Sequence, residues 1–166
     1  MKPFLYGSIS TLVFMLLAAA AVGLAITKLG LIPINADASP SSLEQRVLPA
    51  VVRAAVSREA RLQPVIDNRS DDGALAGAEI YKTMCAQCHG QLSGRSSVLG
   101  ASFYPPAPQL PGRKTAYTER ELFWIVKHGI RNTAMPAWRN QLSDHDIAQV
   151  VAFLKTMGPS SVESTP

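Results

Sequence analysis

Two cysteines and a histidine form the chemically most distinctive group in the sequence. Cys85 and Cys88 are the only cysteines, they are separated by two residues, and His89 follows directly. Residues three apart on one helical turn share a face, so both thiols could reach the two vinyl groups of one porphyrin while the next side chain points toward its iron. C-x-x-C-H is the pattern of c-type haem attachment. We therefore predict one covalent haem c on Cys85 and Cys88, with His89 as an axial ligand.

A disulfide and a zinc site are the alternatives for these three residues. A disulfide between the two cysteines would close a loop too short to constrain the chain. Zinc would need two further ligands. The other histidines, His128 and His145, lie much farther apart in the chain than the roughly three to five residues of a common zinc pair.

Met135 is the predicted second axial ligand. It lies in residues 129–138, a segment bounded by glycine and proline. A lone methionine usually fills a core, but helical core packing does not explain one in a turn-like segment. A thioether suits the sixth position of a His-ligated iron and raises its reduction potential. His128 and His145 are weaker alternatives for this ligand. We expect His128 to end a helix, where a partly positive ring suits the C-terminal dipole. We expect His145 to be exposed in the first turn of the last helix.

Taken together, these motifs resemble a class I, mono-haem cytochrome c. The resemblance spans about residues 73–158 and is carried by Gly77-x-x-x-Tyr81-x-x-x-Cys85-x-x-Cys88-His89-Gly90 and by Met135-Pro136-Ala137-Trp138. The chain is most similar to small membrane-anchored bacterial members with a Met-Pro-Ala sequence at the second ligand. The resemblance implies an all-α, cytochrome c-like fold wrapped around one haem c, and an electron-transfer role.

Further cofactor-binding candidates lie in and beyond the proline-rich loop of residues 93–116. In the family that this chain resembles, a proline carbonyl in this loop accepts a hydrogen bond from the ligand histidine and fixes its tautomer. Pro108 is the predicted residue, with Pro106 as the alternative. Trp138 and Arg113 are candidate donors to a haem propionate, with ordinary surface roles as the alternative for both.

The helices that must position these residues are also predicted. Residues 73–84 form the first helix of the domain. Thr118-Glu119-Arg120-Glu121 is a capping box that opens another, and Ser143-Asp144-His145-Asp146 resembles a second box that opens the last helix. By resemblance, Phe153 or a neighbour packs across the first helix where the two cross.

The N-terminal segment is predicted to cross a membrane. Residues 3–27 carry no charge, and as a helix residues 4–27 would span about 36 Å, against roughly 30 Å of hydrocarbon. Lys2 favours a cytoplasmic N-terminus. A cleaved signal peptide is the alternative, with Ala36-Asp37-Ala38 as a small-x-small site. The length of the apolar segment and its distance from that site favour retention. Either way, the rest of the chain is exported.

These boundaries define four predicted parts. A helix over residues 49–61, with Pro49 at its first position, is expected to be a spacer packed on its own domain or on lipid headgroups, rather than a docking helix for a membrane complex. The parts are a transmembrane anchor (1–34), a linker with that short helix (35–72), a cytochrome c haem domain (73–159) and a disordered tail (160–166).

The expected function is one-electron transfer on the outer face of a membrane. If His89 and Met135 both bind iron, no position is open for substrate, so we do not expect an enzyme; a haem-based gas sensor or enzyme with a labile Met135 is the alternative. The expected location is the bacterial inner membrane with the haem domain in the periplasm. The expected partner is a redox protein or a respiratory or photosynthetic membrane complex. The net charge is only +4, and no basic run interleaves with aromatics, so nucleic-acid binding is not expected.

Overall fold

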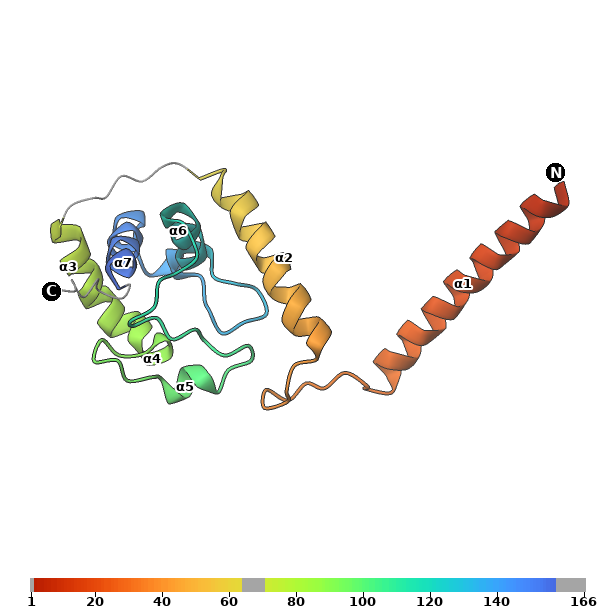
Figure 1. Cartoon of the computed structure of the whole chain (residues 1–166), viewed down its shortest axis with the longest axis horizontal. Helices are drawn as coiled ribbons and strands as arrows, with labels where there is room; N and C mark the ends of the chain where they lie inside the picture. The colour runs from red at the N-terminus through yellow and green to blue at the C-terminus, as the bar shows by residue number, and fades with distance from the viewer. Residues whose placement is uncertain (1, 64–70, 158–166) are drawn as a thin grey trace, which may run out of the picture. The chain divides into compact units, whose positions relative to one another are not determined.

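The computed structural model describes residues 2–63 and 71–157, and within these ranges all regular secondary structure is helical (Figure 1). The predicted all-α fold is confirmed. The chain divides into two compact units, Met1–Ala38 and Ser39–Pro166. The predicted tail at residues 160–166 lies outside the described residues.

The first unit contains α1, Lys2–Lys28. Within the described part of the chain, α1 is the one helix long and apolar enough to cross a membrane, and a signal sequence near the N-terminus meets the same criteria. Its apolar side chains from Tyr6 onward are largely exposed. The anchor therefore remains a prediction, supported by the helix itself.

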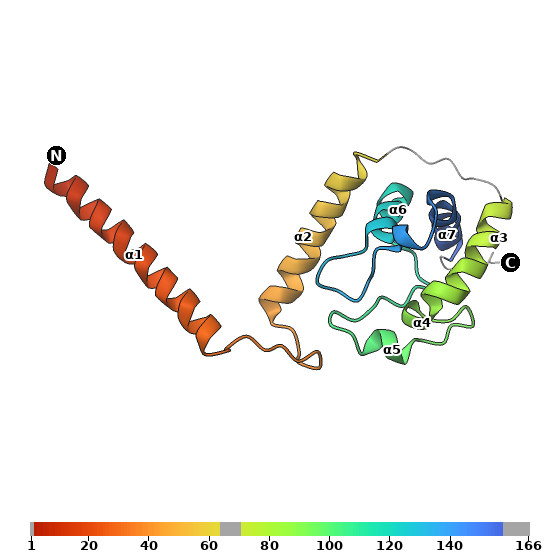
Figure 2. The same cartoon turned by 180° about the vertical axis from the view of Figure 1, so that it is seen from behind.

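The second unit is organised around the crossing of two helices, α3 and α7. The predicted 73–84 helix is found as α3, Asp71–Ile80, which runs into a π-helical turn, η1, at Tyr81–Cys85. The last helix, α7, Asp144–Thr156, crosses α3 (Figures 1 and 2). The ring centroids of Tyr81 and Phe153 lie 5.6 Å apart at this crossing, which confirms the expected contact.

The hydrophobic core lies between α7 and α6, Glu119–His128. Both predicted capping boxes are present, at Thr118 for α6 and at Ser143 for α7. Each satisfies main-chain N–H groups that a helix start leaves unpaired. The buried residues of this core cluster come equally from the two helices: Leu122, Phe123, Val126, Ile147, Ala148 and Val151.

The other described segments of the second unit near Cys85 and Met135 are built from loops and short helical turns. After α4, Ala86–His89, the chain forms a long connection that contains only α5, Val98–Ala101. A second loop after α6 leads into the short 3-10 helix η2, Trp138–Asn140. Both loops therefore depend on side-chain and main-chain hydrogen bonds, described below, for their conformation.

The linker helix begins earlier than predicted. It is α2, Ser42–Ala60, so Pro49 lies inside it rather than at its first position. The Ser41 side chain accepts a hydrogen bond from the Glu44 N–H at 3.2 Å and caps the helix. An internal proline removes one helical hydrogen bond, but α2 gains packing because Val56 and Ala60 are buried. α2 packs beside α6, in agreement with the prediction of a helix on its own domain (Figures 1 and 2).

Candidate haem site

The two cysteines lie where the π-helical turn passes into α4. The Ala86 N–H donates to the carbonyl of Tyr81, five residues back, and Cys85 is the N-cap of α4. π-turns of this kind are frequent at functional sites. Cys85 and Cys88 are free, partly buried thiols on one turn. Burial, and then the neighbouring Cys88, raise the pKa of Cys85 to about 11, so this thiol is uncharged at neutral pH.

His89 is held by the proline-rich loop. Its Nδ1 lies 2.8 Å from the carbonyl oxygen of Pro108. Because a carbonyl can only accept, Nδ1 must carry the proton, which leaves the lone pair of Nε2 for a metal ion. The Leu110 N–H also donates to the carbonyl of His89, at 2.9 Å. Of the two candidate prolines, Pro108 has its carbonyl in the predicted position.

Tyr81 holds the C-terminal end of α4 in place through its hydroxyl group. Its side chain is completely buried, and its hydroxyl donates to the carbonyls of Gly90 at 2.8 Å and His89 at 3.2 Å. Burial is the main cause of the raised pKa of Tyr81, so the hydroxyl remains a donor at physiological pH. The main chain at His89 is thus held by hydrogen bonds from Tyr81 and from Leu110.

Gln109 is a structural residue of the site that sequence reasoning missed. Its Nε2 donates to the carbonyls of Cys88 at 3.2 Å and Ala107 at 3.0 Å, and its Oε1 accepts from the Ser97 N–H at 2.7 Å. One side chain therefore joins the cysteine turn to the first part of the proline-rich loop and to its middle. The only signal in the sequence was its place next to Pro108.

Gly100 belongs to the same junction. A Cβ at this position would overlap the carbonyl oxygen of Cys88. The loop can approach the turn that carries the two cysteines this closely only because Gly100 has no side chain.

The main chain of Met135 is held by a tight turn. Thr133 Oγ1 accepts from the Met135 N–H at 3.1 Å and donates to the carbonyl of Ile130 at 2.7 Å. The Ile130 N–H donates to the Met135 carbonyl at 3.2 Å. Gly129 has φ +67°, and a Cβ there would stand 2.6 Å from the Met135 carbonyl oxygen. The Met135 side chain is partly buried against the core cluster of α6 and α7.

The two other histidines lie at helix ends. His128 ends α6 as predicted, 5.1 Å from the ring of Trp124, measured between ring centroids. Burial, then Arg139, lowers the pKa of His128, so its ring is neutral rather than partly positive as expected. His145 is exposed in the first turn of α7, as predicted.

The two propionate candidates differ in their surroundings. Trp138 opens η2 and packs against the core cluster, whereas Arg113 is exposed in the proline-rich loop. Their roles toward a haem remain predictions.

These donors fit a haem c. Two thiols on one turn, an imidazole whose Nε2 is free, and a thioether on a constrained loop are the groups that a His/Met-ligated c-type haem requires. In residues 2–63 and 71–157 no group of three or more His, Cys, Asp and Glu side chains is arranged to hold a metal ion. The structure shows the hydrogen bond between His89 and the Pro108 carbonyl. Binding of one iron by both His89 and Met135 remains a prediction.

Comparison with known proteins identifies the family of the chain. Residues 72–154 match the family described as cytochrome c oxidase, cbb3-type, subunit III. The cbb3-type cytochrome c oxidase subunit FixPc of Rhizobium leguminosarum bv. viciae is 31% identical over 90 residues, which cover 54% of this chain and 30% of the relative. The chain therefore spans about a third of the length of that curated relative.

Two solved structures are similar at lower identity. One is the reducing HAO-like protein complex Kustc0457/Kustc0458 of Kuenenia stuttgartiensis, with a TM-score of 0.47 and 19% identity, covering 58% of this chain and 50% of that one. The other is cytochrome CL from Methylophaga aminisulfidivorans MPT, with a TM-score of 0.44 and 23% identity, covering 63% of this chain and 69% of that one.

Proposed function

The chain belongs to the cbb3-type cytochrome c oxidase subunit III family, and we propose that it is a one-electron carrier with a single covalent haem c. Cys85 and Cys88 attach the haem, and His89 and Met135 ligate its iron. When bound, the haem supplies a ferric/ferrous couple. The chain has no third cysteine, which supports one haem.

The observation that carries this proposal is the hydrogen bond between His89 and Pro108. It sets the tautomer and orientation of the imidazole and raises its basicity as a ligand. Tyr81 and Gln109 hold the same turn from two other directions. A rigid setting of this kind suits electron transfer, because the geometry around the iron then changes little between the two oxidation states.

We assign no enzymatic role to the chain. Ligation by both His89 and Met135 leaves the iron no open position for a substrate. The turn of residues 129–135 supports a firm sixth ligand, because Thr133 and Gly129 restrict the main chain at Met135.

The proposed location is the bacterial inner membrane. α1 anchors the chain, with its N-terminus in the cytoplasm and the haem domain in the periplasm. The proposed partner is a redox protein or a membrane complex of an electron-transfer chain, and family membership favours a respiratory complex. The mass of the intact native protein tests retention of α1: a mature N-terminus at Ser39 would contradict it.

Haem attachment is tested on the purified holoprotein by a pyridine haemochrome spectrum before and after acid-acetone extraction. We expect a c-type spectrum that survives extraction in the wild type. The variant Cys85→Ser/Cys88→Ser should retain no haem after extraction. Met135→Ala is the matched control, because it changes a ligand but leaves both thioethers. Covalent haem in the double cysteine variant would show that the central assignment is wrong.

A further inference from the structure

α2 has two opposite apolar faces, of which its own domain covers only one. Val52, Val56 and Ala60 follow one another at intervals of four residues, and the last two are each only 2% exposed. Leu43, Val47 and Val51 repeat at the same interval. At 3.6 residues per turn the two rows lie about 180° apart. We call the row of Leu43, Val47 and Val51 the outer face of α2; Leu48 flanks it, between the two rows.

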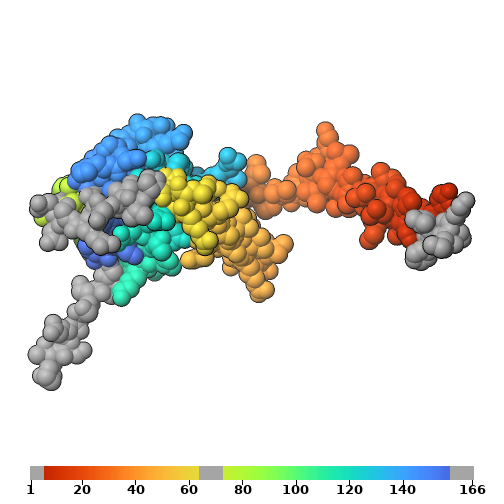
Figure 3. All heavy atoms as spheres, turned by 90° about the horizontal axis from the view of Figure 1, so that it is seen from above, coloured from red at the N-terminus to blue at the C-terminus, as the bar shows by residue number. Residues whose placement is uncertain are grey.

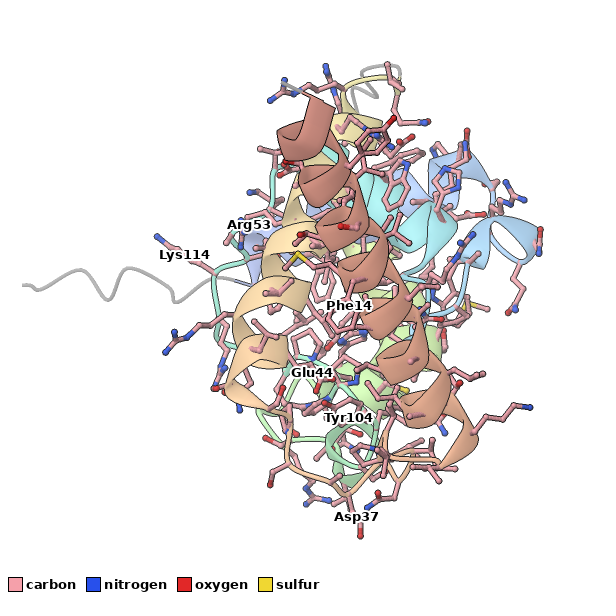
Figure 4. The ribbon with its side chains drawn as sticks, turned by 90° about the vertical axis from the view of Figure 1, so that its right-hand side faces the viewer. Phe14, Asp37, Glu44, Arg53, Tyr104 and Lys114 are labelled. Carbon is pink, nitrogen blue, oxygen red and sulfur yellow. The ribbon has the colours of Figure 1, made fainter. Side chains whose placement is uncertain are left out.

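α2 is fixed to the haem domain by one contact near its start, one in its middle and one near its end. Near its start, the Tyr104 hydroxyl of the proline-rich loop donates to Glu44 Oε1 at 2.5 Å (Figure 4). In the middle, the Arg53 guanidinium lies 5.0 Å from the centre of the Tyr117 ring. Near its end, Ser57 donates to Glu121 of α6. With these contacts in place, α2 cannot rotate to bury its outer face in its own domain.

The outer face is left in solvent. Leu43 is 71% exposed, Val47 45% and Val51 57%, and the flanking Leu48 is 52% exposed. The space-filling view shows α2, yellow to orange, lying along the surface of its unit (Figure 3). An exposed apolar row of this kind on a folded domain marks an interaction site.

Three features of the chain identify a lipid surface as the occupant. Residues 29–41 separate α1 from α2, and they span at most about 45 Å even when fully extended. The start of this connection is itself apolar and exposed, with Leu29 at 70%, Leu31 at 62% and Ile34 at 98%. Apart from Arg53 and Glu44, which contact the haem domain, residues 42–61 carry three arginines against one glutamate, a balance that favours anionic headgroups.

We propose that the outer face of α2 lies in the headgroup region of the bilayer that holds α1, with anionic lipids around its arginines. This inference rests on the anchor of the proposed function. Because the inner side of α2 is bound to α6 and to the proline-rich loop, contact with the membrane holds the haem domain in one orientation. One face of the haem domain would then always be turned to partners at the membrane surface.

The test uses the full-length holoprotein in nanodiscs of phosphatidylethanolamine and phosphatidylglycerol, with a small fraction of phospholipid that carries a diazirine near the headgroup end of its acyl chain. After illumination, lipid adducts are mapped by peptide mass spectrometry. We expect adducts on α1 and on residues 42–51. Leu43→Glu should reduce adducts on α2 at least threefold, and Leu43→Glu/Val47→Glu should reduce them further. Leu75→Glu is the matched control, because Leu75 lies on α3 and is also 71% exposed.

The outcomes separate the inference from the proposed function. Adducts on α1 with none on α2 in the wild type would overturn the inference and leave the anchor standing. An absence of adducts on both helices would overturn the anchor as well. Labelling of α2 that is unchanged by Leu43→Glu/Val47→Glu would mean that the short connection alone brings the helix near lipid, and would also overturn the inference. Wild-type labelling shows whether α2 reaches lipid at all. If the double variant folds poorly, Leu43→Glu alone distinguishes docking of the outer face from proximity that the short connection imposes.

Discussion

Gly77 of α3 lies directly against the main chain of Gln149 on α7. A Cβ at Gly77 would overlap the Gln149 carbonyl oxygen and stand 2.9 Å from the Val150 N–H nitrogen. Both obstacles are main-chain atoms of a helix, so neither can move without shifting α7. One helical turn further on, Tyr81 and Phe153 pack together and continue the same contact. The approach of the two helices therefore depends on the absence of a side chain at one position.

Gly77→Ala should destabilise the haem domain although alanine is the better helix former. The added methyl group forces α3 and α7 apart, and overpacking of this kind costs about 1–3 kcal/mol. The measurement is chemical denaturation of the holoprotein. Leu75→Ala, at an exposed position on the same helix, should change the free energy of unfolding by no more than about 0.5 kcal/mol. Equal stability of Gly77→Ala and the wild type would mean that the helices do not cross this closely.

Gln109→Leu should loosen the proline-rich loop. The substitution leaves the Ser97 N–H and the Cys88 and Ala107 carbonyls without their partner, and each unsatisfied group that stays buried costs about 1–3 kcal/mol. We expect faster amide exchange in residues 97–110 and a lower free energy of unfolding. Gln141→Leu, at an exposed position, is the control. If exchange in the loop is unchanged, Gln109 does not hold the loop.

Glu121 should make stability depend on pH in the acid range. The Ser57 hydrogen bond, followed by the Thr118 N–H, lowers the pKa of Glu121 below its ordinary value of 4.5. The unfolded chain then binds more protons near that pH, so the contribution is complete above pH 4.5 and is lost as the pH falls through the lower, folded value. Glu121→Gln should reduce stability at pH 7 by about 1 kcal/mol or less.

The difference between Glu121→Gln and the wild type should shrink as the solution is acidified. Ser57→Ala should have a smaller effect of the same sign, because it removes only the first cause of the lowered pKa. Unfolding curves from pH 7 to pH 3 provide the measurement. A constant difference across that range would mean that the carboxylate of Glu121 is not stabilised by folding.

The parts of the structure that follow local rules were predictable from the sequence. The capping boxes at Thr118 and Ser143 give the starts of α6 and α7, because a helix start needs side-chain acceptors and these residues supply them. Cys85, Cys88 and His89 were recognisable because their spacing matches one helical turn. Pro108 came from the family resemblance, and its carbonyl meets His89 in the structure.

The parts that depend on tertiary contacts were not predictable. Pro49 suggested a helix start, but the Ser41 cap and the packing of Val56 place the start of α2 seven residues earlier, at Ser42. The neutral state of His128 follows from burial, which no local pattern reveals. Gln109 connects main-chain groups that are distant in sequence, and a single glutamine carries no mark of such a role.

Met135 provides the prediction that separates a carrier from a gas sensor or an enzyme. A thioether favours ferrous iron relative to a second imidazole, so Met135→His should retain the haem and lower its reduction potential. The new side chain still donates a lone pair, so the iron should remain six-coordinate. Met135→Ala should open the sixth position, and carbon monoxide should then bind readily to the reduced protein.

Met135→Ala should also reduce stability, by about 2 kcal/mol, since Met135 packs against the core cluster of α6 and α7. A redox titration and a carbon monoxide difference spectrum of the wild type and both variants test these expectations together. Thr133→Val is a useful control: it removes the hydroxyl that holds the Met135 N–H but keeps the thioether. It should bind carbon monoxide to an extent between the wild type and Met135→Ala, because the sulfur is present but less firmly positioned. If the wild type already binds carbon monoxide as well as Met135→Ala does, Met135 is not a firm ligand, and the sensor or enzyme hypothesis replaces the carrier.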